Sequence, residues 1–156
     1  GQKNKYEWVS LGSSFELNEL SSAVLLSQLE DINEITEIKK RNFYRYISSL
    51  NNLIEYGLIS IQNIPDKVSS NYHSFYILLK ENNNDFISYL YKNKIQSYIG
   101  YSPLHNSQYG KRNGLYNQLK NTERTYKRLV RLPSHANLKL SEIDYICKTI
   151  QNYFKK

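Results

Sequence analysis

Three histidines and one glycine–serine turn are the parts of this sequence whose residue types could do chemistry. His73, His105 and His135 lie far apart, and none sits in a metal-spacing cluster, a P-loop or a G-x-S-x-G turn. A lone histidine that opens a strand, as His73 is expected to, is more often a structural hydrogen-bonding residue. His105 lies in a long loop, where functional residues are common. The sequence therefore contains no self-contained catalytic set.

The turn Gly12-Ser13-Ser14 precedes an apolar helical pattern and has two interpretations. Free N–H groups and the helix dipole make a helix N-terminus suitable for an anion such as phosphate. Ser13 and Glu16 also fit the S-x-x-E capping box, in which both side chains bind free backbone N–H groups. Local sequence favours plain capping, and the anion site stays open as the alternative.

Length and composition indicate one ordinary cytoplasmic domain. A chain of 156 residues can bury roughly 70% of its unfolded surface without disulfides or metals. The single cysteine, Cys147, lies in the apolar pattern of the last helix, which favours a packed thiol in a reducing compartment. No apolar run approaches the roughly 20 residues that span a bilayer, and no signal peptide opens the chain. The absence of methionine and the opening Gly-Gln-Lys suggest a part of a longer protein.

Charge divides unevenly between the two halves of the chain. Residues 1–78 carry seven Lys/Arg and nine Asp/Glu, whereas residues 79–156 carry fourteen and five, for a net charge of +7. A basic half suits anionic partners, including phosphate groups and nucleic acid. The fifteen tyrosines are scattered rather than arranged for base stacking. A nucleic-acid-binding or other non-catalytic interaction module remains the alternative interpretation, although no nucleic-acid or membrane partner is expected.

The first third of the chain predicts helix. Apolar residues recur at three- and four-residue steps over residues 14–56, and Gly57 is placed to end the pattern. One long helix, or two meeting near residues 31–33, is expected. Its first part is apolar on two faces, formed by Leu17, Leu20 and Val24 and by Leu25, Leu29 and Ile32. A helix apolar on two faces is buried on both, so it should contact more than its own domain.

The remainder predicts a small sheet with packed helices, an α+β architecture. The expected strands cover residues 59–64, 71–79, 96–101 and 131–133. A helix is expected over residues 85–94, with Phe86, Ile87, Leu90 and Tyr91 facing inward. A final helix is capped by Ser141-x-x-Asp144 and carries the apolar residues Ile143, Ile146, Cys147, Ile150 and Phe154.

A segment without periodicity separates the expected 96–101 strand from the next helix. It contains His105, Lys111 and Arg112. Loops of this length in compact domains are usually functional or disordered. Arg124, Lys127, Arg128 and Arg131 follow at spacings that would place them on one helical face, where a solvated surface is the simpler interpretation.

Four stretches, taken together, resemble one known family. They are YEWVSLGSSFELNELSSAVLLSQLE, NYHSFYILL, YSPLH and LVRLPSHANL. In this order and spacing they resemble the C-terminal part of the DegT/DnrJ/StrS sugar aminotransferases, over nearly the whole chain. Within that family they resemble most the TDP-4-oxo-6-deoxy-D-glucose transaminases. Those open this region with Y-x-W-x-x-x-G-S-S-Y, similar to Tyr6-x-Trp8 through Phe15 here.

The resemblance implies the small domain of a fold-type-I enzyme that depends on pyridoxal 5'-phosphate (PLP). Residues 1–57 would form an interdomain turn and long connecting helix, and residues 58–156 a small α+β domain with a mostly antiparallel sheet. A large N-terminal domain, whose motifs do not match here, would supply the Schiff-base lysine and most of the homodimer contact. This chain alone is expected to be inactive.

The resemblance also implies a reaction and a set of binding residues. The full enzyme would transfer an amino group, from glutamate, to a keto-sugar nucleotide such as TDP-4-oxo-6-deoxyhexose, for cell-surface polysaccharide or related amino-sugar synthesis. Ser14 stands where many members have an asparagine that reaches the cofactor phosphate of the partner subunit, and Ser13 is its neighbour. His105, Tyr101 and Lys111 are the implied substrate-binding residues.

Overall fold

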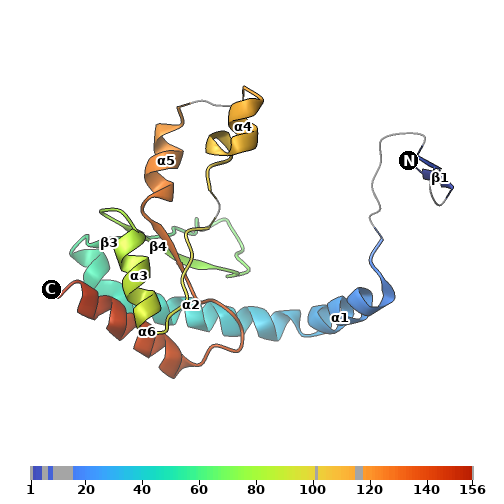
Figure 1. Cartoon of the computed structure of the whole chain (residues 1–156). Helices are drawn as coiled ribbons and strands as arrows, with labels where there is room; N and C mark the ends of the chain where they lie inside the picture. The colour runs from blue at the N-terminus through green and yellow to red at the C-terminus, as the bar shows by residue number, and fades with distance from the viewer. Residues whose placement is uncertain (1, 5–6, 9–15, 101, 115–117, 156) are drawn as a thin grey trace. The chain divides into compact units, whose positions relative to one another are not determined.

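The computed structural model describes residues 2–4, 7–8, 16–100, 102–114 and 118–155 (Figure 1). The chain divides into two compact units, Gly1–Glu34 and Ile35–Lys156. The first unit contains two short antiparallel strands, β1 (Gln2–Asn4) and β2 (Glu7–Trp8), and helix α1 (Glu19–Glu30). The second unit contains the sheet, the remaining helices and the hydrophobic core.

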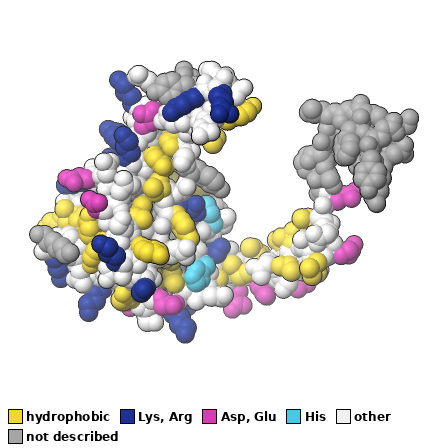
Figure 2. All heavy atoms as spheres, in the orientation of Figure 1, with side chains coloured by type: hydrophobic (Ala, Val, Ile, Leu, Met, Phe, Trp, Pro, Cys, Tyr) yellow, Lys and Arg dark blue, Asp and Glu magenta, His cyan; other side chains and the backbone are white. Residues whose placement is uncertain are grey.

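Helix α1 begins at Glu19, five residues later than the pattern predicts. Asn18 is its N-cap, and the Asn18 side chain accepts a hydrogen bond from the Ser21 N–H at 2.8 Å. The expected Ser13–Glu16 capping box falls partly outside the described residues. None of the residues of α1 is buried, and apolar side chains lie exposed along it, with Leu20 77% and Leu26 59% accessible (Figure 2). The described residues of its own unit therefore leave the apolar side chains of α1 uncovered.

Helix α2 (Ile32–Glu55) follows after a break at Asp31, which confirms the two-helix alternative. The buried side chains of α2 follow the helical period and comprise Asn42, Phe43, Tyr46, Leu50 and Leu53. The helix ends where predicted. Gly57 adopts φ +62°, a conformation that favours glycine, and its N–H donates to the Ile54 carbonyl at 2.9 Å.

The sheet has three antiparallel strands in the order β3 (Ile59–Ile61), β4 (Phe75–Leu79) and β5 (Leu129–Leu132). Alternate residues of the central strand β4 are buried, as period-2 packing on one face requires. Strand β4 starts four residues later than predicted. Tyr72 has φ +50°, and the Asn71 side chain accepts from the His73 N–H at 3.2 Å, so this stretch forms a turn.

The expected strand over residues 96–101 is wrong. Within its described part, residues 96–100, the backbones of Tyr98 and Arg131 form a single bridge and exchange hydrogen bonds of 3.1 and 2.7 Å. The chain turns at Lys94, which has φ +62°, while the Ile95 N–H closes the end of the preceding helix on the Leu90 carbonyl. This turn leaves the segment in contact with β5 at a single position.

Helix α3 (Asn84–Lys92) confirms the helix predicted over residues 85–94, but not all of the side chains predicted to face inward are buried. Phe86 and Leu90 are buried, whereas Tyr91 is 75% exposed and was wrongly expected to face the core. Helix α6 (Leu140–Tyr153) buries Ile143, Ile146, Cys147 and Ile150 as predicted. Its start differs, because the Glu142 carboxylate accepts from the Lys139 N–H at 2.8 Å, so Ser141 and Asp144 do not form the cap.

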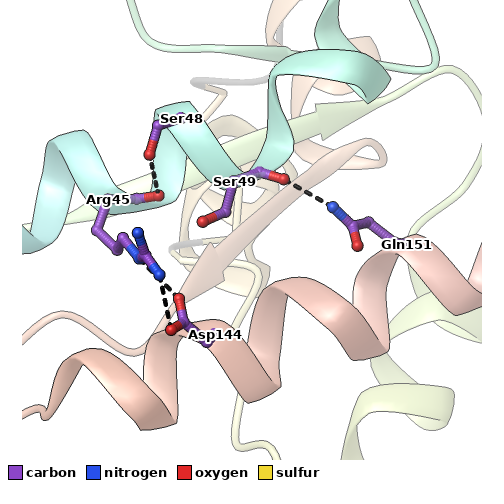
Figure 3. A network of polar contacts seen from close by, with 5 residues as sticks. All are labelled: Arg45, Ser48, Ser49, Asp144 and Gln151. Carbon is purple, nitrogen blue, oxygen red and sulfur yellow. Dashed lines mark hydrogen bonds and ion pairs between the residues drawn. The ribbon is translucent and has the colours of Figure 1, made fainter.

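Helices α2 and α6 lie side by side and are joined by polar contacts (Figures 1 and 3). Arg45 donates two hydrogen bonds to the Asp144 carboxylate, at 2.7 and 2.8 Å, and Gln151 donates to the Ser49 carbonyl at 2.7 Å. Burial beside this network raises the pKa of the Cys147 thiol to about 12. The thiol is therefore protonated at neutral pH, as expected for a packed cysteine rather than a reactive one.

The Arg45–Asp144 pair gives the fold a dependence on acid pH. The hydrogen bond from Arg45 lowers the pKa of the Asp144 carboxyl in the folded chain. Its contribution to stability is therefore present above the unfolded pKa of about 3.9 and lost as the pH falls through the folded value. Asp144→Asn should lower the melting temperature slightly at pH 7, and the difference from wild type should vanish in strong acid. A difference that stays constant down to acid pH would contradict this assignment.

Candidate substrate-binding site

The segment that contains His105 is ordered into two short helical turns. The 3₁₀ helix η1 (Leu104–Asn106) leads into α4 (Gln108–Arg112) through Ser107. The Ser107 hydroxyl donates to the Leu104 carbonyl at 2.7 Å and accepts from the Gly110 N–H at 3.0 Å. One serine thus ends η1 and caps α4, which folds back residues that carry no periodic signal in the sequence.

His105 is buried, with 8% of its surface accessible, and contacts helix α5 (Lys120–Tyr126). Its Nε2 lies 3.2 Å from Oε1 of Glu123, and the Asn106 amide donates to the same oxygen at 3.5 Å. The hydrogen bond from His105 is the main cause of a lowered pKa for the Glu123 carboxyl. The pair therefore holds η1 against α5.

A pocket of about 500 Å³ lies beside this pair. Its walls carry a carboxylate from Glu123, an amide from Asn106, hydroxyls from Ser102 and Ser107, and the ammonium of Lys127. Ligand pockets commonly combine a few such polar groups with apolar surface, which Pro103 and Tyr126 provide here. The arrangement can donate and accept hydrogen bonds, as recognition of a hydroxylated ligand requires.

The structure brings together only some of the residues that the sequence singled out. Lys111 is exposed on α4, in the same folded segment as His105. Tyr101, Ser13 and Ser14 lie outside the described residues. His73 stands apart from this segment, exposed, with Nδ1 3.1 Å from the Asn71 side-chain oxygen. Within the described ranges, no group of three or more His, Cys, Asp or Glu could hold a metal ion, and no helix is long and apolar enough to cross a membrane.

The prediction that Arg124, Lys127, Arg128 and Arg131 share one helical face is wrong. Helix α5 ends at Tyr126, so Arg124 is helical while Arg131 lies on β5. The backbone explains the early end: Asn83 N–H donates to the Lys127 carbonyl at 2.8 Å, and Leu79 N–H donates to the Arg128 carbonyl at 2.9 Å. Because of these hydrogen bonds, the chain leaves the helix after Tyr126 and continues toward β5.

Two polar residues that the sequence analysis missed position the site. Glu123 is the only Asp or Glu between Asp85 and Glu142, a signal that could have identified it as the partner of a histidine. Asn83 is 3% exposed, and its amide donates to the carbonyls of Tyr126 and Leu129 at 3.0 and 2.8 Å. Asn83 thus fixes the junction between α5 and β5, and with it the direction of the helix that carries Glu123.

Gly110→Ala should loosen this segment. A Cβ at position 110 would lie 2.5 Å from the Leu104 carbonyl oxygen and 3.0 Å from that of His105, closer than real contacts allow. Relieving the overlap moves η1, at a cost of about 1–3 kcal/mol for an overpacked site. Amide hydrogen exchange over residues 104–112 should accelerate by about 5- to 150-fold, the ratio that this free-energy cost corresponds to.

Gln108→Ala is the matched control, because Gln108 is exposed on the same short helix. It should leave the exchange rates nearly unchanged. If Gly110→Ala exchanges like the wild type, the close approach of α4 and η1 does not hold the segment together.

Comparison with known proteins gives the context of this fold. A family model, the DegT/DnrJ/EryC1/StrS aminotransferase family, matches residues 1–151. Among solved structures, Helicobacter pylori PseC, an aminotransferase involved in the biosynthesis of pseudoaminic acid, is 24% identical with a TM-score of 0.81; this chain aligns over 99% of its length with 42% of PseC. A DegT DnrJ EryC1 StrS aminotransferase from Brucella abortus is 25% identical with a TM-score of 0.80, covering 99% of this chain and 40% of that one.

A third similar structure is S. venezuelae DesV in complex with a ketimine intermediate. It is 20% identical with a TM-score of 0.83, and the match covers 100% of this chain and 42% of DesV. The chain thus spans about two fifths of the length of the structures it matches, and its α+β fold is that of their C-terminal part. Because the family model covers nearly all 156 residues, this chain belongs to the DegT/DnrJ/EryC1/StrS aminotransferase family.

Proposed function

We propose that this chain is the C-terminal part of a PLP-dependent sugar aminotransferase and acts only together with a large N-terminal domain. The family match over residues 1–151 carries this proposal. Two observations support it. The chain spans about two fifths of similar aminotransferase structures, and α1 exposes apolar side chains on both faces. We propose that the large domain covers those faces.

PLP supplies an electron sink when it is bound to a lysine of such an enzyme. We propose that the large domain supplies this lysine, desolvates it so that it can act as an amine nucleophile, and holds the cofactor.

We propose that the substrate is a keto-sugar nucleotide, such as a TDP-4-oxo-6-deoxyhexose, and that glutamate is the amino donor. The His105 segment is the proposed contact to the substrate. His105 is held through Glu123, so its role is to position the turn, while Lys111 is free to reach an anionic group from α4. Tyr101, next to this turn in the sequence, is proposed to complete the contact. Cell-surface polysaccharide or related amino-sugar synthesis would use the product.

The turn at Ser13 and Ser14 is proposed to bind the cofactor phosphate of a partner subunit in a cytoplasmic homodimer. In the complete enzyme, Ser14→Ala should weaken PLP retention, measured as the fraction of cofactor kept after dialysis. Ser60→Ala, an exposed serine on β3, is the control and should keep the cofactor. Equal retention in both variants would contradict a phosphate-binding role for this turn.

An experiment on the 156-residue chain alone tests whether the large domain supplies the Schiff-base lysine. The 156-residue polypeptide mixed with PLP should show neither the absorbance band of a lysine-bound cofactor nor amino transfer. The complete protein should show both under the same conditions. Lysine-bound cofactor and transfer by the short chain would overturn the proposal that the large domain supplies the lysine.

A further inference from the structure

A second pocket, of about 840 Å³, lies on the folded unit away from the His105 segment. It is bounded by the residues before β4, the turn after α3, the end of β5 and the first turns of α6. Its floor is formed by the buried apolar residues Ile95, Leu132, Leu138 and Ile146. The volume falls within the range of about 300–1,000 Å³ typical of small-molecule sites. We call it the basic pocket.

The polar lining of the basic pocket contains two cationic side chains and several groups that can donate hydrogen bonds. Lys94 and Arg131 supply permanent positive charge, and His73 and His135 supply ring nitrogens. Ser74, Ser134 and Ser141 add hydroxyls to the lining. Histidine surface is visible beside Lys/Arg surface on the face of the folded unit shown in Figure 2.

The two cations of the basic pocket are not neutralised within the described part of the chain. Neither Lys94 nor Arg131 forms an ion pair with a described carboxylate. The one acidic residue of the lining, Glu142, accepts a hydrogen bond from the Lys139 N–H at 2.8 Å. Lys94 and Arg131 (+2) and Glu142 (−1) together give the lining a net charge of +1.

Backbone contacts fix the elements that carry these groups. Arg131 exchanges two backbone hydrogen bonds with Tyr98, and its Cδ lies 3.6 Å from where a Cβ of Gly100 would be. The Tyr145 hydroxyl donates to the Asn93 carbonyl at 3.0 Å, which ties α6 to the turn that presents Lys94. Asn71 Oδ1 lies 3.1 Å from His73 Nδ1 and so sets the direction of that ring. The backbone segments that carry Lys94 and Arg131 are thus held in place, which reduces the ordering that ligand binding requires.

We propose that the basic pocket binds the phosphate group of a small phosphorylated molecule. Two cationic side chains in the lining, against one carboxylate, favour an anion, and phosphate oxygens can accept hydrogen bonds from several donors at once. A single carboxylate has one charge and fewer acceptor positions, so it would leave part of this donor set unused. The exposed rings of Tyr98 and Tyr145 and the apolar floor provide surface for the organic part of the ligand.

The test is an NMR titration of the 156-residue chain, without PLP, at constant ionic strength. The probes are inorganic phosphate, pyrophosphate, uridine diphosphate and, as the carboxylate comparison, glutamate. The phosphorylated probes should shift the amide signals of residues 94–98, 131–135 and 141–146, and glutamate should bind at least tenfold more weakly. Arg131→Gln and Lys94→Asn should each weaken pyrophosphate binding by about tenfold, the loss expected for a charge-assisted hydrogen bond. Asparagine at position 94 tolerates the positive φ.

Lys148→Gln is the matched control. Lys148 is exposed on α6 outside the pocket, and its replacement by glutamine removes the same unit of charge. It should bind pyrophosphate like the wild type. No shift with any phosphorylated probe, or an equal loss in Lys148→Gln and Arg131→Gln, would overturn the proposal. Tighter binding of uridine diphosphate than of pyrophosphate would identify a nucleotide as the source of the phosphate, and equal binding would identify a free phosphate group. Because no cofactor or transfer is measured, the result is independent of the proposed aminotransferase function.

Discussion

Replacing Phe75 by alanine should lower the free energy of unfolding by about 3–5 kcal/mol, the cost of removing a large aromatic side chain from a packed core. Phe75 is fully buried at the start of the central strand. Its ring stacks on Tyr46 with centroids 4.6 Å apart and meets the edge of Phe43 at 5.2 Å. The substitution therefore removes the contact between α2 and the sheet along with the buried area. Urea unfolding followed by circular dichroism measures the loss.

Tyr91→Ala is the control for that substitution. Tyr91 is 75% exposed on α3, so its replacement should change the free energy of unfolding by no more than about 0.5 kcal/mol. Similar losses in the two variants would mean that the aromatic contact between α2 and β4 is not the centre of the core.

Asn83→Ala should lower the free energy of unfolding by about 1–3 kcal/mol and loosen the His105 site at the same time. The Asn83 amide donates to two carbonyls, those of Tyr126 and Leu129, and both lose a partner when the side chain is removed. These carbonyls mark the end of α5 and the start of β5. Because α5 carries Glu123, the hydrogen exchange of Asn106 and Ser107 should accelerate together with that of α5.

Asn82→Ala is the matched control, since Asn82 is an exposed asparagine in the adjacent position. It should be nearly neutral in both stability and exchange. If Asn83→Ala destabilises the chain but leaves the hydrogen exchange of residues 104–107 unchanged, Asn83 stabilises the core without positioning the His105 site.

Helices were predictable where one apolar face packs on the core. The period of Phe43, Tyr46 and Leu50 and the glycine at position 57 located α2 and its end, because burial and capping act on the local sequence. Strand ends were less predictable. The strand expected over residues 96–101 is a turn and one bridge instead. Its pairing depends on β5, about thirty residues later in the chain, and the local sequence does not show how much of β5 is available to it.

The side chain that caps a helix also depends on long-range contacts, which the local sequence pattern does not show. Asp144 fits a capping box in sequence, yet it pairs with Arg45, nearly a hundred residues earlier, and Glu142 takes the cap. His105 stands out in the sequence because of its long loop and stays a predicted site residue, whereas its contact with Glu123 was not predicted. The turns around Ser107 and Gly110 depend on contacts that close only in three dimensions.

If this chain works as part of a sugar aminotransferase, a complete protein that joins it to the proposed large N-terminal domain should transfer an amino group. The most direct test is to incubate that protein with PLP, glutamate and a TDP-4-oxo-6-deoxyhexose and to measure the amino sugar formed. The complete protein should form the amino sugar, and the 156-residue chain should form none. A complete protein that lacks a Schiff-base lysine and transfers no amino group to any keto-sugar nucleotide would contradict this proposal and favour a non-catalytic interaction module.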